Sequence, residues 1–173
     1  RILEKQGLQF KLGHKVTEAK AGKDGVSLKV ESAKGGAADT LKADTVLLAI
    51  GRRPYIDGLG LKEAGVKFSD HGFVETDQHY QTNIEGIFAI GDVIGGQMLA
   101  HKAEDEGVAC AEILAGEPGH VNYEAIASVV YTWPEAAGVG KTEEQLKDEG
   151  VAYKVGKFPF TANGRARCNG DTD

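Results

Sequence analysis

Residues 82–102 combine an acidic side chain, a glycine-rich turn and the expected start of a long helix. Their sequence is TNIEGIFAIGDVIGGQMLAHK, in which Asp92 follows a short apolar stretch and Gly95-Gly96 precede a helix predicted to begin near Gln97. A carboxylate accepts hydrogen bonds from sugar or polyol hydroxyls. A helix N-terminus presents free N–H groups and the positive end of the helix dipole to an electron-rich acceptor. Together these features predict a site for a nucleotide cofactor with a long hydroxylated tail.

The same residues also have a purely structural interpretation. A Gly-Asp pair after a strand is often only a turn, and an aspartate near a helix start often only caps the helix. The order of the elements favours a ligand site, because ligands of open α/β sheets bind beyond the carboxyl ends of the strands. We therefore expect residues 87–90 to form a strand buried on both faces, with Asp92 at its carboxyl end.

Composition excludes several classes of protein. The 173 residues are 41% hydrophobic and 27% charged, which is typical of a packed globular protein. The net charge of −6 and the absence of a Lys/Arg run argue against nucleic acid as a partner. No apolar run approaches the ~20 residues that span a bilayer. The two cysteines, Cys110 and Cys168, form neither a CxxC pair nor a metal cluster, and Cys110 is expected to be a core thiol.

The two ends of the sequence predict that it is a piece of a longer protein. It does not begin with Met, and its first residues, RILEKQG, have neither the apolar core nor the cleavage site of a signal peptide. They are typical of the last turns of a helix that ends at Gly7. Residues 169–173 stop within a turn-like stretch.

The first part of the sequence predicts a small antiparallel meander. Residues 8–12 alternate apolar and polar side chains, as a strand does. Residues 16–21 and 26–31 are expected to form a hairpin around a Lys-Asp-Gly turn, and residues 40–43 to add a further strand. Alternating Lys and Glu residues indicate that one face of this sheet is exposed to water.

The next segment is continuously apolar and does not alternate apolar with polar residues. Residues 46–50 (VLLAI) are continuously apolar, which predicts a strand buried on both faces. This strand ends at Gly51, where the lack of a side chain would let a ligand or another backbone come close. The long helix is predicted to run from Gln97 to about Ala115.

The last third of the sequence predicts the start of another domain. Strands are expected at residues 128–131 and 137–139, followed by a helix whose first residues, Thr142 and Gln145, have the spacing of a capping box. A further strand is expected at residues 153–158. Two buried strands that each end in Gly at a loop, followed by this segment, indicate the ends of two dinucleotide folds and the start of a third domain.

Several segments resemble a known family. Residues 82–92 resemble the second flavin-binding motif of the pyridine nucleotide–disulfide oxidoreductases, and residues 49–54 (AIGRRP) resemble the motif that closes their NAD domain. Residues 98–107 (MLAHKAEDEG), 139–147 and 155–160 resemble one branch of this family, the dihydrolipoamide dehydrogenases. The resemblance covers essentially the whole chain.

The resemblance implies an α/β fold: the ends of two Rossmann-like FAD/NAD-binding domains, followed by the start of an α+β dimerisation domain. Residues 1–53 would be the C-terminal part of the NAD-binding domain and residues 54–119 the C-terminal part of the FAD-binding domain. Residues 120–173 would be the N-terminal part of the dimerisation domain. Resemblance to the dihydrolipoamide dehydrogenases implies that electrons pass from dihydrolipoamide to a protein disulfide, then to FAD and then to NAD.

The resemblance also implies which residues contact the cofactors. They are Asp92, Met98, Leu99, Ala100, His101, Gly51 and Val16. Asp92 would bind the sugar-alcohol part of FAD, and N–H groups of residues 98–101 would stabilise negative charge on the reduced flavin ring. Gly51 would let NAD approach and Val16 would pack near its adenine end, although a turn glycine and a core valine are the ordinary structural alternatives. We give His101 no acid–base role.

Three characteristic motifs of the family do not occur in this sequence. They are the GxGxxG phosphate-binding loops, the Cys-x4-Cys redox disulfide and the His-x4-Glu base pair that lies near the C-terminus of the family's proteins. In addition, Trp133 stands where the family usually has His. We therefore assign no catalytic residue and no metal ligand, and we expect this segment to be inactive alone.

Three hypotheses about function stay open at this point. The first is a dihydrolipoamide-oxidising enzyme seen in part. The second is a sibling flavoenzyme, such as glutathione reductase, mercuric reductase or a soluble transhydrogenase, which would keep Asp92 but not the run at residues 101–107. The third is a nucleotide-binding module without catalysis.

The first hypothesis carries expectations about partners and location. By resemblance it implies a homodimer that binds the lipoyl-bearing acyltransferase of 2-oxoacid dehydrogenase complexes, with neither nucleic acid nor membrane as a partner. The location would be the bacterial cytoplasm or the mitochondrial matrix.

Overall fold

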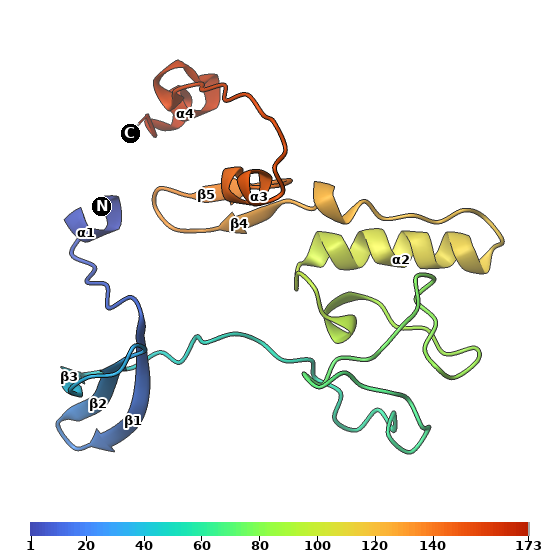
Figure 1. The fold of residues 1–173 in the computed structure, drawn as a ribbon, viewed down its shortest axis with the longest axis horizontal. Coiled ribbons are helices and arrows are strands. Elements are labelled where there is room, and N and C mark those ends of the chain that lie inside the picture. The colour runs from blue at the N-terminus through green and yellow to red at the C-terminus, as the bar shows by residue number, and fades with distance from the viewer. Residues whose placement is uncertain (173) are drawn as a thin grey trace. The chain divides into compact units, whose positions relative to one another are not determined.

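The computed structural model describes residues 1–172, which divide into two units (Figure 1). The first unit is Arg1–Gly51 and the second begins at Arg52.

The first unit consists of a short helix and a three-stranded antiparallel sheet. Helix α1 (Ile2–Lys5) stops before Gly7, whose φ of +99° is a conformation that favours glycine, so the predicted helix end is confirmed. Strands β1 (His14–Gly22), β2 (Gly25–Ser32) and β3 (Asp39–Ala43) pair in the order β1-β2-β3. The predicted hairpin and third strand are therefore confirmed.

Two strands predicted in this unit do not form. Residues 8–12 lie outside the sheet, and so do residues 46–50, where Leu47 and Ile50 are 87% and 89% exposed. The prediction of a strand buried on both faces at residues 46–50 is wrong for this structure. A parallel strand needs hydrogen-bonded neighbours and covering helices. Among the described residues of this unit, the one sheet ends at Ala43 and no strand pairs with residues 46–50.

The second unit begins with loops that lead to the turn containing Asp92. Residues 87–90 were predicted to form a strand buried on both faces, and this prediction is wrong. They form an isolated bridge with the segment at residues 80–82, in which Thr82 N–H donates to Ile87 O at 2.8 Å and Ala89 N–H to Tyr80 O at 2.9 Å. Pairing on one side leaves the segment only partly covered. The chain then enters the 3-10 helix η1 (Gly91–Ile94).

The long helix α2 (Ala100–Leu114) is the centre of this unit. It begins three residues after the predicted start. Met98 and Leu99 lie before the helix, and Leu99, at the N-cap position, has extended backbone geometry. One face packs on the hydrophobic core formed by Tyr80, Ala109, Cys110, Val121 and Ile126. Cys110 is a buried free thiol, as predicted.

The remainder of the chain forms small elements. The 3-10 helix η2 (Tyr123–Ala125) precedes the antiparallel strands β4 (Ser128–Val130) and β5 (Ala136–Gly138), which confirm the two predicted strands. Helix α3 (Glu143–Asp148) begins with the predicted capping box of Thr142 and Gln145. The 3-10 helix η3 (Phe160–Ala162) and helix α4 (Gly164–Asn169) follow. The strand predicted at residues 153–158 does not form.

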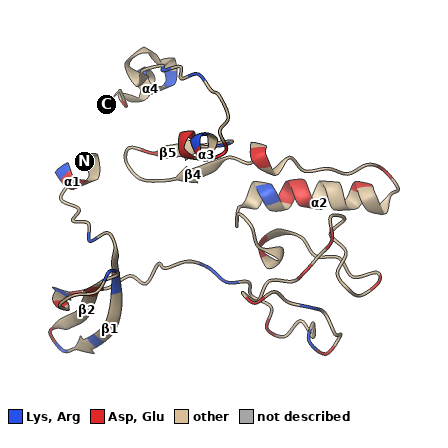
Figure 2. Ribbon diagram, in the orientation of Figure 1, with Lys and Arg blue, Asp and Glu red and all other residues tan. Residues whose placement is uncertain are grey.

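Acidic and basic residues are interspersed in both units (Figure 2). Within residues 1–172, none of the helices combines the length and the apolar character needed to cross a membrane.

Candidate functional site

Asp92 lies in a turn whose shape depends on Gly91. Gly91 has a φ of +76°, which L side chains rarely adopt. A Cβ atom at this position would also lie 3.1 Å from the Cβ of Ala103 on α2. Both constraints favour glycine. The backbone immediately before Asp92 therefore has a fixed conformation.

The Asp92 side chain is accessible. It is 44% exposed, and its Oδ2 lies 3.4 Å from Nη2 of Arg52. An ion pair this exposed contributes little to stability, because water screens it. The carboxylate is therefore open to exchange this neighbour for the hydroxyl groups of a ligand.

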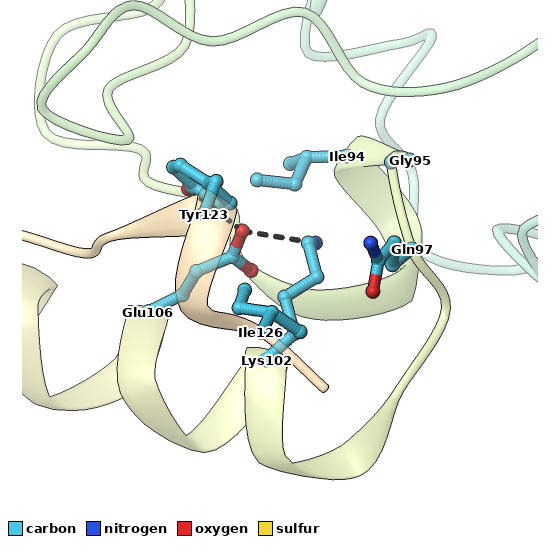
Figure 3. A pocket seen from close by; sticks show the side chains of 8 residues that line it. Ile94, Gly95, Gln97, Lys102, Glu106, Tyr123 and Ile126 are labelled. Atoms are coloured by element: carbon cyan, nitrogen blue, oxygen red, sulfur yellow. Dashed lines mark hydrogen bonds and ion pairs between the residues drawn. The ribbon is translucent and has the colours of Figure 1, made fainter. Parts of the chain in front are cut away.

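A buried ion pair on α2 holds the backbone of Gly91. Figure 3 shows Lys102 and Glu106 directed toward one another, with 2.9 Å between Lys102 Nζ and Glu106 Oε1. The two side chains are only 3% and 0% exposed. Gly91 N–H donates to Glu106 Oε2 at 2.7 Å, and Lys102 Nζ donates to Gly91 O at 3.2 Å. The pair thus binds both polar backbone groups of the same residue.

Tyr123 extends this network toward the end of the chain. Its hydroxyl donates to Glu106 Oε1 at 2.9 Å and lies 3.4 Å from the hydroxyl of Tyr80. Burial raises the pKa of Tyr123 well above its usual value, and the hydrogen bonds to Tyr80 and Glu106 raise it further. Tyr123 therefore stays a neutral donor, and η2 is tied to the middle of α2.

The start of α2 is the second part of the candidate site. No side chain caps this helix at Leu99, so its first N–H groups keep their capacity to bind an acceptor. Met98 and Leu99 are partly buried, whereas Ala100 and His101 are exposed. The Nε2–H of His101 donates to Ala127 O at 2.9 Å, which gives this ring an ordinary structural partner.

The structure brings Asp92 and the start of α2 into one region. Helix α2 and η1 contact each other, and a pocket of about 220 Å³ opens beside them. The pocket is lined by Ile94, Gly95, Gly96, Gln97, Lys102, Glu106, Tyr123 and Ile126. Its volume is below the roughly 300–1,000 Å³ of typical ligand pockets, so it would accommodate part of a dinucleotide at most.

The chemistry of these groups fits a hydroxylated cofactor. An accessible carboxylate suits a polyol, and an uncapped helix start suits an electron-rich ring edge. No group of His, Cys, Asp and Glu side chains suited to a metal ion occurs among the described residues.

Gly51 and Val16 belong to the first unit. Gly51 has a φ of +129°, and no atom lies within 4 Å of a Cβ built there, so the position is open. Val16 is on β1, opposite Val30 of β2, and is 59% exposed. Both positions could be reached by a ligand, and their contacts with NAD stay predictions.

The sequence interpretation missed Lys102, Glu106 and Tyr123. A signal was present for two of them, because Leu99, Glu106 and Cys110 share one face of α2 at helical spacing. Lys102 lies on that face four residues before Glu106. A complementary charge pair on an apolar helix face indicates a buried ion pair. For Tyr123 we find no comparable sequence signal.

Comparisons with known proteins agree on the relationship. Residues 1–107 match the family model described as "Pyridine nucleotide-disulphide oxidoreductase", and residues 126–173 match its "dimerisation domain". These matches confirm the predicted fold class, a Rossmann-like part followed by the start of a dimerisation domain. The exact domain boundaries stay a prediction.

Individual relatives were found by sequence. The chain is 58% identical to "Dihydrolipoyl dehydrogenase 3" of Pseudomonas putida and 53% identical to the mitochondrial dihydrolipoyl dehydrogenase of Homo sapiens. Each match covers 100% of this chain, but only 37% and 34% of the respective relative. The chain thus spans about a third of the length of these curated relatives, and the predicted resemblance to the dihydrolipoamide dehydrogenases is confirmed.

Solved structures give the same result. The HOCl-induced flavoprotein disulfide reductase RclA of Escherichia coli superposes with a TM-score of 0.82 at 29% identity, over 99% of this chain and 38% of that one. LpdA of Mycobacterium tuberculosis superposes with a TM-score of 0.81 at 25% identity, over 98% of this chain and 36% of that one. The chain therefore belongs to the pyridine nucleotide–disulphide oxidoreductase family.

Proposed function

We propose that the protein carrying this chain is a flavoprotein disulfide oxidoreductase that converts dihydrolipoamide and NAD⁺ to lipoamide and NADH. The observation that carries this proposal is the 53–58% identity, over all of this chain, to dihydrolipoyl dehydrogenases. The accessible Asp92 carboxylate beside the uncapped start of α2 supports it independently. The proposal concerns the intact protein, because this chain spans about a third of those relatives.

Within this proposal, the residues of this chain bind and orient the cofactors. Asp92 accepts hydrogen bonds from the ribityl hydroxyls of FAD. Backbone N–H groups of residues 98–101 stabilise negative charge at the pyrimidine end of the flavin. Gly51 lets NAD approach, and Val16 contacts its adenine end. When bound, FAD supplies the two-electron transfer that links the disulfide to NAD.

The proposal extends to partners and location. The protein forms a homodimer through the domain that begins in residues 126–173, which match a dimerisation domain. It binds the lipoyl-bearing acyltransferase of 2-oxoacid dehydrogenase complexes. It works in the bacterial cytoplasm or the mitochondrial matrix, the two settings that the named relatives suggest.

The test is a comparison of substrates with the purified intact protein. A flavin absorbance band shows whether FAD is present, and NADH formation is then measured with dihydrolipoamide. Parallel assays follow the reduction of glutathione disulfide and of Hg²⁺ by reduced nicotinamide nucleotide. We expect a flavin band and the highest kcat/KM with dihydrolipoamide. A higher kcat/KM with glutathione disulfide or Hg²⁺ would select a sibling enzyme, and absence of flavin would refute the proposal.

A further inference from the structure

We infer that the buried Lys102–Glu106 ion pair is a positioning device for cofactor binding, which fixes the Gly91 backbone so that the Asp92 carboxylate faces the FAD polyol. Lys102 and Glu106 are thus positioning residues that act through Asp92. The inference rests on the proposed function and adds residues for which that function alone gives no role.

The Lys102–Glu106 pair carries an energetic cost. Lys102 stands in the first turn of α2, where the helix dipole disfavours a cation. Both side chains are removed from water, and burying two charges costs as much as their attraction returns. Replacement of a buried ion pair by apolar residues of similar volume is often neutral or stabilising. Stability alone therefore does not account for the pair.

Both members of the pair form a hydrogen bond with the same residue, Gly91. Glu106 accepts the N–H of Gly91 at 2.7 Å, while Lys102 donates to the C=O of Gly91 at 3.2 Å. Two side chains, one helical turn apart, thus bind the two polar groups of a single residue. That residue has a positive φ and directly precedes Asp92. The orientation of the Asp92 backbone is consequently set from α2.

Helix α2 supplies or holds both halves of the candidate site. Its uncapped start presents N–H groups, and its buried pair holds the turn that carries the carboxylate. A shift of the turn relative to the helix would separate the two groups that are proposed to bind one cofactor. A rigid connection between them pre-organises the site and lowers the ordering cost of binding.

The test is a double-mutant cycle on FAD affinity in the intact protein. FAD is removed, and FAD is then titrated back while its fluorescence is followed. The variants are Asp92→Asn, Glu106→Gln and the two together. Glu104→Gln is the matched control, because Glu104 is an exposed glutamate of the same helix. In Glu106→Gln a single amide oxygen cannot serve both Gly91 and Lys102, and the amide NH2 group faces either the Gly91 N–H or the Lys102 ammonium, which are both donors.

We expect Asp92→Asn and Glu106→Gln each to weaken FAD binding by about tenfold, the scale of one charge-assisted hydrogen bond. If Glu106 acts through Asp92, the combined variant also binds FAD about tenfold more weakly than the parent. The second substitution then removes no further interaction with FAD. Glu104→Gln stays within about twofold of the parent, as is usual for surface substitutions.

Other results would overturn the inference in distinguishable ways. Losses that multiply to about a hundredfold in the combined variant show independent roles. An unchanged affinity in Glu106→Gln shows that the pair does not position the site. If the parent protein binds no FAD, or if Asp92→Asn binds it normally, the proposed cofactor site fails first and the inference fails with it.

A second variant decides the matter if Glu106→Gln does not fold. In Lys102→Met/Glu106→Leu the buried charges are replaced by apolar side chains of similar size, a change that folded proteins often tolerate. We expect this variant to melt close to the parent in the absence of FAD and to bind FAD about tenfold more weakly. A normal FAD affinity, or a loss that only accompanies unfolding, overturns the inference.

Discussion

Replacing Glu106 with Ala breaks the most completely buried ion pair of the described residues. Glu106 is fully buried and serves three partners: Lys102 at 2.9 Å, Gly91 N–H at 2.7 Å and the Tyr123 hydroxyl at 2.9 Å. In Glu106→Ala the Lys102 ammonium keeps only its contact with Gly91 O. The variant therefore leaves a buried cation and two donors without their acceptor.

The expected loss of stability follows from these contacts. Removal of one partner of a buried ion pair typically costs about 3–5 kcal/mol. For a domain of about 150–250 residues, each kcal/mol lowers the melting temperature by roughly 2–4 °C. Glu106→Ala should therefore lower the melting temperature by about 6–20 °C. Lys102→Met/Glu106→Leu should lose less, because it strands no charge.

The assay is thermal unfolding of the FAD-free intact protein, since bound FAD would add its own stabilisation. The matched control is Glu104→Ala, which truncates an exposed glutamate of the same helix and should shift the melting temperature by about 1–2 °C at most. A Glu106→Ala protein that melts together with Glu104→Ala would refute the reasoning, because it would show that the pair carries no net interaction.

Further substitutions test other parts of the structure. Burial and the hydrogen bonds to Tyr80 and Glu106 raise the pKa of Tyr123 above the ordinary value of 10.0. The neutral Tyr123 hydroxyl therefore contributes fully to the free energy of unfolding below about pH 10, and this contribution falls as the pH rises further. The loss of unfolding free energy above pH 10 should therefore be smaller in Tyr123→Phe, and identical pH profiles would contradict this. Gly119→Ala places a Cβ 2.1 Å from Ala109 O, which forces a backbone shift. The free energy of unfolding measured with a chemical denaturant should fall by about 1–3 kcal/mol. An unchanged denaturation midpoint would argue against this close packing of Gly119 on α2. Thr142→Ala removes the capping box of α3 and should weaken hydrogen-exchange protection of Glu143–Asp148 by about 1 kcal/mol, and equal protection would show that the cap is dispensable.

Local signals in the sequence predicted local structure well. The β1–β2 hairpin depends on a Lys-Asp-Gly turn between alternating strands, and the α3 capping box depends on two residues three positions apart. The glycine-rich turn at Gly95-Gly96 was predicted for the same reason, and both glycines have a positive φ. Such features need no knowledge of distant residues.

Features that depend on distant partners were predicted poorly. Residues 46–50 have the apolar pattern of a central strand, but pairing requires a neighbouring strand, and the described part of their unit provides none. Glu106 finds its partners 15 residues before it, at Gly91, and 17 residues after it, at Tyr123. Charged side chains usually lie on the protein surface, so the burial of Glu106 was not predicted.

The central claim is that the Asp92 carboxylate binds a hydroxyl group of the FAD polyol. The most direct test measures the affinity of the intact FAD-free protein and of Asp92→Asn for FAD and for FAD analogues that each lack one ribityl hydroxyl. We predict that one such analogue binds the parent about tenfold more weakly than FAD, whereas Asp92→Asn, which keeps only a neutral acceptor, discriminates less between that analogue and FAD. If every analogue loses the same affinity in both proteins, Asp92 does not contact the polyol and the account is contradicted.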